Sequence, residues 1–363
     1  MAERSQQVKH NRKKQRAILQ HSHRELIFDI LARLPGQHLH NSIRYVCKPW
    51  CNLISTPLFV KTHLHNSKHG PIIHEPMSHG GRLISLQPIK KSGQWGIEEH
   101  EFFETRCSGL IRGSCNGLLL LQDRILRRTL HVMNPITKQL MTLPKCSSPS
   151  ACKQHICCYG LSFVPSTNEY KVVHLYDKGN DYDSNIGCEI LTLGYSSDFT
   201  WKPVLNDNSR FQSIVPRGFS SSMGVSANGV LHWKVPSKGF IMSLDVKTET
   251  FHGTGYSNCN TWSGFLFWPG GCLALVDWIS GFQLHIWVLK DLDGGLWVKQ
   301  KSVGLDLLGC LPASFNPTGV LENGVVIIYR KGCWKYGQWF AYNFKVNEIK
   351  EIKMKIKGVE VCT

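Results

Sequence analysis

Two cysteines stand four residues apart in the stretch RYVCKPWCNLI, where Cys47 and Cys51 could hold a metal ion or act as reactive thiols. Four residues is about one helical turn, so a helix would place both sulfurs on one face. A zinc site needs two further ligands at suitable spacing, and a catalytic thiol needs a base and an electropositive setting. Lys48 alone does not supply these. The stretch therefore indicates a segment of apolar side chains that pack together.

A second group of potential metal ligands comprises Cys146, Cys152, His155, Cys157 and Cys158. Their spacing is not that of a zinc finger or zinc ribbon, and Cys157-Cys158 begins an apolar run typical of a strand. We expect a loop followed by a buried strand here, and no metal or other cofactor.

The segment DYDSN, at residues 181–185, resembles the start of a calcium loop. Its sixth position is Ile186 instead of the required Gly, and its twelfth is Thr192 instead of Glu. A solvated hairpin loop is the better interpretation. Because no nucleophile elbow, phosphate loop or dinucleotide fingerprint occurs either, we expect no catalytic residue and a protein that is not an enzyme.

The composition is that of a globular protein, with 363 residues, 42% hydrophobic and 19% charged, and a formal net charge of +16. Such a charge favours acidic partners. Part of it lies in a basic run between Lys9 and Arg16, within residues 1–20, which we interpret as a disordered tail. The remaining Lys and Arg residues are scattered without interleaved aromatics, so nucleic acid is not the expected partner.

The cysteines favour a reducing compartment, since none of the fourteen forms a C-x-x-C pair and no N-x-S/T glycosylation acceptor is present. The N-terminus lacks the apolar core of a signal peptide. The most apolar window, FLFWPGGCLALVDWISGF, is interrupted by proline, glycine and aspartate. We expect a location in the cytoplasm, the nucleus or both, without a membrane partner.

Residues 21–65 have the periodicity of short helices. Ser22 and Glu25 form a capping-box pattern, and Pro35-Gly36 ends the first helix. Two further short apolar segments follow, the last ending at Thr56-Pro57. The apolar positions of the three predicted helices are Leu26, Ile27, Ile30, Leu31 and Leu34, then Leu39, Ile43 and Val46, then Trp50, Leu53 and Ile54. So small a core is marginal alone, and docking to a partner would stabilise it.

The rest of the chain predicts strands, and several segments share one pattern. An Asn-Gly turn opens an apolar strand at Asn116-Gly117, Asn228-Gly229 and Asn323-Gly324. After a further apolar run, a polar turn stands at Asn134-Pro135, Asp245-Val246 or Asn343-Phe344. The runs beginning GCLALVDW and YGLSFVPSTNEYKVVHLY are degenerate copies, and in the second the turn is Pro165 to Asn168.

Repeated sheets of this kind bury their apolar faces by stacking radially, which predicts a β-propeller. With blades of about 40 to 45 residues, the repeat region corresponds to about six blades, and five or seven stay open. The C-terminal run IKMKIK, at residues 352–357, alternates apolar residues with lysine as edge strands do. Our hypothesis is that this last strand joins the first blade and closes the ring.

The order ELIFDILARLP, Leu39, RYVCKPWCNLIS, then Pro57, Phe59 and His63 resembles the F-box. The repeat region is similar to the F-box-associated (FBA-type) β-propeller domain of plant F-box proteins, most clearly in GSCNGLLLL with NPITKQLMTLP and in YGLSFVPSTNEYKVV. The resemblance implies a three-helix F-box at residues 21–65, a linker and first strands at 66–105, and the propeller at 106–363. The chain departs from the family at Ser22-His23, where Leu-Pro is usual, and it is one residue longer between Pro35 and Val46.

The resemblance also implies a function, namely a substrate-receptor subunit of an SCF-type ubiquitin ligase. The F-box would dock onto a Skp-family adaptor, and through it a cullin, while the propeller recruits a target protein. Carried over by position, the residues expected at the adaptor are Leu26, Ile30, Leu31, Leu34 and Pro35, with Val46 and Trp50 anchoring the later helices. The net charge suits an acidic or phosphorylated target.

Two alternatives stay open at this level. One is a carbohydrate-, protein- or nucleic-acid-binding propeller that stands outside a ligase. The other is an enzyme built on the propeller, because propellers can host metal or radical chemistry.

Overall fold

The computed structural model describes twenty stretches of the chain: residues 24–67, 70–77, 80–91, 94–105, 109–126, 128–147, 157–177, 186–194, 198–204, 224–235, 240–255, 265–267, 273–279, 283–291, 294–304, 315–321, 325–330, 338–343, 345–352 and 360–362. The expected basic tail, Ser22-His23, Asn323-Gly324 and DYDSN lie outside these residues. The chain divides into two compact units, Met1–Lys68 and His69–Thr363, here called the helical unit and the strand unit.

The helical unit contains a helix whose described part covers residues 24–31, followed by α2 (Gly36–Asn41), the 3₁₀ helix η1 (Ile43–Tyr45), α3 (Lys48–Ile54) and α4 (Pro57–Asn66). The first helix ends before Pro35-Gly36, as predicted. The sequence interpretation missed α4, which begins where the last helix was expected to end. Thr56 caps α4 by accepting a hydrogen bond from the Phe59 backbone N–H through its side chain, at 3.3 Å. Pro57 occupies the first turn, where its missing N–H costs nothing.

The core of the helical unit is small. Its buried side chains are Leu31, Ala32, Leu39 and Phe59. Helix α4 is fixed to the first helix by the edge-on contact of Phe28 with Phe59, whose ring centroids are 5.3 Å apart, and by His63 Nε2, which donates to the Leu34 carbonyl at 2.8 Å. In the described part of the chain, no helix is long and apolar enough to cross a membrane.

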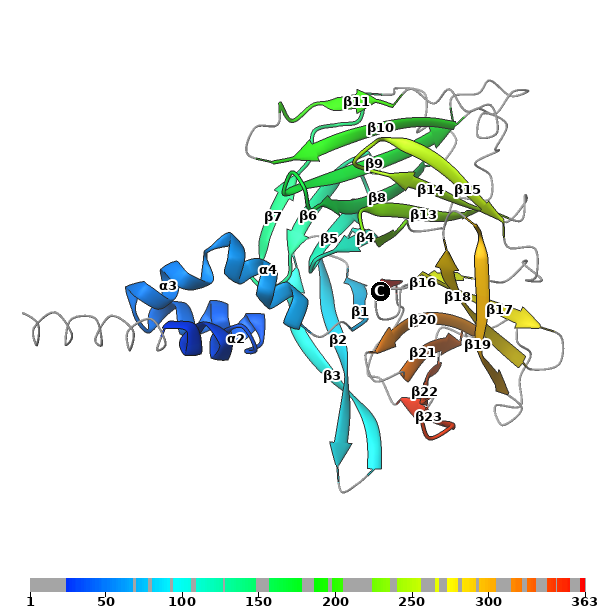
Figure 1. Ribbon diagram of the computed structural model, residues 1–363, viewed down its shortest axis with the longest axis horizontal. Coiled ribbons are helices and arrows are strands. Elements are labelled where there is room, and N and C mark those ends of the chain that lie inside the picture. The colour runs from blue at the N-terminus through cyan, green and yellow to red at the C-terminus, as the bar shows by residue number, and fades with distance from the viewer. Residues whose placement is uncertain are drawn as a thin grey trace, which may run out of the picture. The chain divides into compact units, whose positions relative to one another are not determined.

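The described strands of the strand unit form six four-stranded antiparallel sheets (Figure 1). The first contains β24 (Glu360–Cys362), β1 (Ile72–Met77), β2 (Gly80–Lys91) and β3 (Gln94–Thr105). The second contains β4 (Leu110–Cys115), β5 (Leu118–Gln122), β6 (Leu130–Asn134) and β7 (Gln139–Thr142), and the third contains β8 (Cys157–Val164), β9 (Glu169–Asp177), β10 (Ile186–Leu193) and β11 (Trp201–Pro203).

The remaining sheets repeat this order. The fourth contains β12 (Val225–Ala227), β13 (Val230–Val235), β14 (Phe240–Asp245) and β15 (Thr250–Gly255). The fifth contains β16 (Phe265–Phe267), β17 (Ala274–Ile279), β18 (Gln283–Asp291) and β19 (Leu296–Gly304), and the sixth contains β20 (Phe315–Leu321), β21 (Val325–Arg330), β22 (Gln338–Asn343) and β23 (Glu348–Ile352).

The Asn-Gly turns join the first and second strands of a sheet, as the sequence predicts. Asn116 and Gly117 have φ of 50° and 79°, and Asn228 and Gly229 have φ of 51° and 81°. Two consecutive positive φ angles are what a tight type I′ hairpin requires, and Asn followed by Gly adopts them most readily. The hairpins β4–β5 and β12–β13 therefore form at these positions.

The polar turns join the third and fourth strands, again as predicted. The side-chain Oδ1 of Asn134 accepts hydrogen bonds from the backbone N–H groups of Ile136 and Thr137. Asp245 does the same with Lys247 and Thr248. Such turns are stabilised by a short side chain that replaces a backbone acceptor.

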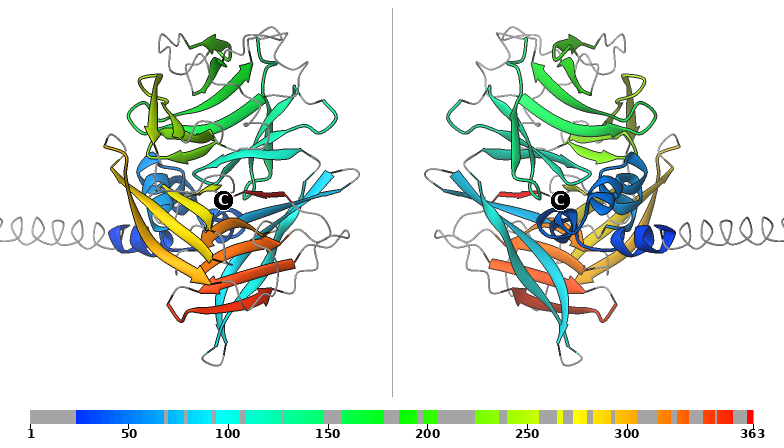
Figure 2. Two further views of the ribbon diagram at one scale, coloured as in Figure 1. Left: turned by 90° about the vertical axis from the view of Figure 1, so that its right-hand side faces the viewer. Right: turned by 90° about the vertical axis from the view of Figure 1, so that its left-hand side faces the viewer.

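The sheets follow one another in a closed cycle, so the expected β-propeller architecture is confirmed. Neighbouring sheets are in contact through β24 and β4, β4 and β8, β8 and the β12–β13 hairpin, β13 and β16, β16 and β20, and β20 and β24 (Figures 1 and 2). Apolar clusters fill the space between neighbouring sheets, and one of them, which includes Trp233, lies between the third and fourth.

The ring closes through a strand other than the one predicted. In the first sheet, β24 pairs antiparallel with β1, with Ile73 opposite Val361. The run IKMKIK contributes only Ile352 to the described strands, at the end of β23 on the outer edge of the sixth sheet, and residues 353–357 lie outside the described residues. The described closing strand is therefore Glu360–Cys362.

Candidate functional sites

The helix at residues 24–31 has two apolar faces, and only one of them is packed. Leu31 is 2% exposed and lies in the core, with Ile27 and Phe28 packed against it. On the other face, Leu26 and Ile30 are 58% and 54% exposed. These two residues are four apart, so their side chains are neighbours on the helix surface. An exposed Leu–Ile pair on a helix is a surface suited to an apolar partner.

The seven residues expected at an adaptor thus fall into two groups. Leu26, Ile30, Pro35 and Val46 are exposed. Leu31 is buried, while Leu34 and Trp50 are half-buried and packed against the core of the helical unit. The second group supports the fold of the free chain, and its contact with an adaptor stays a prediction.

Exposed apolar side chains are concentrated in the helical unit beyond the expected residues. The sequence interpretation did not single out Tyr45 at 73%, Leu58 at 68% or Val60 at 45% exposure. Leu58 and Val60 belong to α4, which was not predicted, while Tyr45 lies in the stretch RYVCKPWCNLI. Six large apolar side chains are exposed within residues 24–67: Leu26, Ile30, Tyr45, Val46, Leu58 and Val60.

The stretch RYVCKPWCNLI is structural in its second half. Cys47 precedes the first residue of α3, and Pro49 lies in its first turn. Leu53 and Ile54 pack with Trp50 against the core. Its first half faces outward, with the Arg44 guanidinium 5.4 Å from the centroid of the Tyr45 ring.

The strand unit buries several polar groups without activating them. Burial raises the pKa of the Cys115 thiol to about 11, even though the Ser226 hydroxyl donates a hydrogen bond to its sulfur at 3.8 Å. Such a thiol stays protonated and is a poor nucleophile. Burial also lowers the pKa of His232 to about 4, and this neutral imidazole lies 2.8 Å from the Ser243 hydroxyl.

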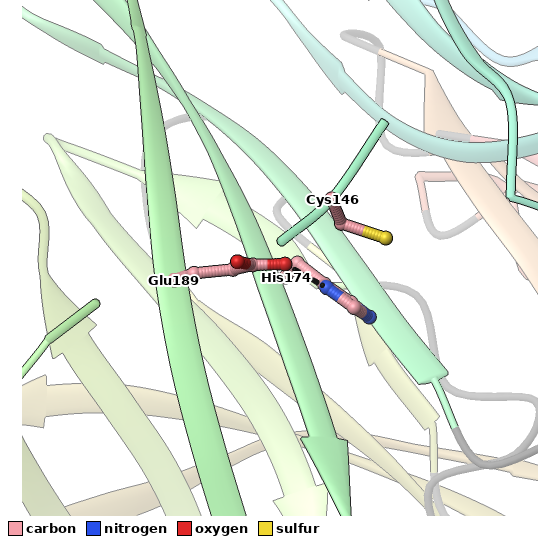
Figure 3. A group of neighbouring side chains, drawn as sticks. All are labelled: Cys146, His174 and Glu189. Carbon is pink, nitrogen blue, oxygen red and sulfur yellow. Dashed lines mark hydrogen bonds and ion pairs between the residues drawn. The ribbon is translucent and has the colours of Figure 1, made fainter. Parts of the chain in front are cut away.

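One group of described residues brings three metal-binding side chains together, namely Cys146, His174 and Glu189 (Figure 3). Their ligand atoms all lie within 4.8 Å of one another. From the sequence, Cys146 is a potential metal ligand, but its surroundings predict a loop. Sequence reasoning does not identify His174 or Glu189, although each is a polar residue within an apolar strand and could have been noticed for that reason.

Comparison with protein families gives one match that covers most of the chain. The model described as "F-box associated beta propeller domain" matches residues 84–362.

Curated relatives from Arabidopsis thaliana extend the similarity to the helical unit. The F-box protein At3g57590 is 24% identical, over 93% of this chain and 87% of its own length. The F-box protein At3g07870 is 25% identical, over 82% of this chain and 74% of its own. The F-box protein CPR1 is 25% identical, over 74% of this chain and 69% of its own.

Proposed function

Since the chain belongs to the plant F-box proteins that carry an F-box associated beta propeller domain, we propose that it is the substrate-receptor subunit of an SCF-type ubiquitin ligase. In this role the helical unit docks onto a Skp-family adaptor, which connects it to a cullin. The strand unit recruits the protein that is to be ubiquitinated.

The observation that supports the docking step is the exposed pair Leu26 and Ile30. Burying a Leu or Ile side chain that is otherwise exposed contributes about 1.5–3 kcal/mol. The described part of this unit has four buried apolar residues in its core, and an apolar partner would add substantially to it.

The proposed mechanism is proximity, and the chain itself performs no chemistry. Holding a target beside the conjugating enzyme raises its effective concentration and turns an encounter between molecules into a step within one complex. The raised pKa of the partly buried Cys115 thiol accords with a protein that has no nucleophile at this position.

The target and the location are proposed from charge and sequence. A net charge of +16 suits an acidic or phosphorylated target protein in the cytoplasm or nucleus. The number of blades is a proposal as well, and the six four-stranded sheets support the expected value of about six.

A ubiquitination experiment in plant cells tests this function. Tagged wild-type chain and a Leu26→Asp/Ile30→Asp variant are captured after the proteasome is inhibited, and ubiquitin remnants on the captured proteins are counted by mass spectrometry. Because both substitutions are at exposed positions, the variant should fold and capture the same proteins. We expect those proteins to carry ubiquitin with the wild-type chain and several-fold less with the variant.

Two results would count against the proposal. Equal ubiquitination with wild type and variant would show that the exposed face of the helical unit is not required for ubiquitination. Capture of the same proteins without ubiquitin in either case would leave a binding propeller that acts outside a ligase.

A further inference from the structure

His174 lies in the middle of β9, between two residues of the neighbouring strands. The strand register places Tyr159 of β8 directly opposite it on one side and Glu189 of β10 on the other. Residues paired in this way project from the same face of the sheet. Tyr159 belongs to an apolar cluster with Leu120 and Leu130 of the second sheet. The row Tyr159, His174 and Glu189 therefore faces the space between the second and third sheets.

The imidazole of His174 is fully buried and held on several sides. Tyr159 stacks on it, with ring centroids 4.7 Å apart and an interplanar angle of 17°, and Trp201 meets it edge-on. Glu189 Oε1 lies 2.8 Å from Nδ1. The other ring nitrogen, Nε2, is buried and has no hydrogen-bond partner within the described residues.

Cys146 lies beside His174 and Glu189, in a segment that is anchored on both sides. Trp201 Nε1 donates a hydrogen bond to the Pro144 carbonyl at 2.9 Å, two residues before the cysteine. The Ser147 backbone N–H, directly after it, donates to Glu189 Oε2 at 3.2 Å. One carboxylate thus holds both the histidine and the segment that carries the cysteine. Figure 3 shows the three side chains converging from β9, β10 and the segment that follows β7.

We propose that Cys146, His174 and Glu189 form a zinc-binding site between the second and third sheets. Thiolate sulfur and imidazole nitrogen are the donors that zinc prefers in proteins. Zinc takes the place of the hydrogen between Nδ1 of His174 and Oε1 of Glu189, which lie 2.8 Å apart, and the Cys146 thiolate is the third ligand. The fourth position is left for a water, as in other sites with three protein ligands. The bound ion fixes the segment that carries Cys146 to the third sheet.

The test uses the purified full-length chain with cobalt(II) as the probe. A cobalt ion bound by a thiolate gives a sulfur-to-metal charge-transfer band, and we expect one equivalent of cobalt, displaceable by zinc. Cys146→Ala and His174→Gln should each lose this equivalent. Glu189→Gln should weaken cobalt binding at least about tenfold, because it replaces a charged ligand with a neutral amide.

The matched control is Cys188→Ala. Cys188 is buried, precedes Glu189 on β10 and therefore points to the opposite face of the sheet. This control should keep the full cobalt band, which distinguishes the proposed site from binding by the other cysteines. A wild-type chain without the band, or a Cys146→Ala variant that retains it, would overturn the proposal.

A second measurement covers the case in which the variants do not fold. In the wild-type chain, a zinc chelator should lower the melting temperature and speed the alkylation of Cys146, mapped by peptide mass spectrometry. If the chelator changes neither, the site binds no zinc.

Discussion

Buried histidines in the strand unit are surrounded by protein groups instead of water. His232 is 3% exposed, and its Nδ1 lies 2.8 Å from the Ser243 hydroxyl. Because the charged imidazolium cannot be hydrated there, its pKa falls from 6.5 to about 4. The neutral form is the one that the folded protein accommodates.

This pKa shift makes stability depend on pH. As the pH falls from about 6.5 towards 4, the unfolded chain takes up a proton at His232 that the folded chain does not accept, and the unfolded state gains stability. The shift corresponds to roughly 3 kcal/mol that is present above pH 6.5 and is lost by about pH 4. We expect urea unfolding of the wild type to show this loss.

A His232→Gln variant isolates the contribution of this residue. It cannot take up the proton, so the difference in unfolding free energy between wild type and variant should shrink as the pH falls from about 7 to about 5. A difference that is constant with pH would show that His232 titrates normally in the folded state.

The first helix shows what single residues reveal before a structure is known. The apolar residues Leu26, Ile27, Ile30, Leu31 and Leu34 identify an amphipathic helix. They are too many for one narrow face, and periodicity alone does not tell which of them pack inward. The answer depends on Leu39 and Phe59, which complete the core around Leu31 and leave Ile30 outside.

Hairpins are the elements that local sequence specifies most directly. Gly117 and Gly229 occupy turns with φ near +80°, where a side chain is strained whatever space surrounds it. We expect Gly117→Ala and Gly229→Ala each to lower the free energy of unfolding by about 1–2 kcal/mol, the cost of the left-handed conformation. Chemical denaturation measures this effect.

Gly255 provides the control for this prediction. It lies at the end of β15, and an added Cβ there would meet no atom within 4 Å and no left-handed backbone. Gly255→Ala should therefore leave stability nearly unchanged. Equal losses at all three positions would mean that the turn geometry is not the cause.

Elements joined by long-range pairing could not be predicted in the same way. The Asn-Gly and Asn-Pro turns act within a few residues, so their pattern located the hairpins correctly. The pairing of β10 with β9 places Glu189 beside His174 through a register across 15 residues, which no local turn signal specifies. The helix α4 was missed because Thr56-Pro57 is a helix start as well as a stop.

Closure of the ring is a property of the whole strand unit. Only three residues of β24, Glu360–Cys362, pair with β1, yet β24 also contacts β4 and β20. This pairing joins β24 to the start of the propeller, about 290 residues earlier in the sequence. The repeats indicate that the ring must close, but no local signal specifies so distant a pairing, so the sequence predicted the wrong closing strand, IKMKIK.

Removing the closing strand should open the first sheet. We expect deletion of residues 360–363 to destabilise the strand unit by roughly 2–4 kcal/mol, from about 1 kcal/mol for each lost ladder hydrogen bond. Deletion of Thr363 alone is the control and should have little effect. Unchanged thermal unfolding of the longer deletion would contradict closure by β24.

The proposed function requires the helical unit to bind a Skp-family adaptor through its exposed apolar face. The most direct measurement is the dissociation constant of the purified chain for that adaptor by isothermal titration calorimetry. It compares wild type, Leu26→Asp/Ile30→Asp and the control Leu140→Asp/Met141→Asp, in which the changed pair is exposed on β7. We predict that the helix variant binds at least about a hundredfold more weakly, since each apolar contact contributes about 1.5–3 kcal/mol, and that the control binds as the wild type does. Equal affinity of all three proteins, or no binding by a folded wild type, would show that this face is not an adaptor-binding surface.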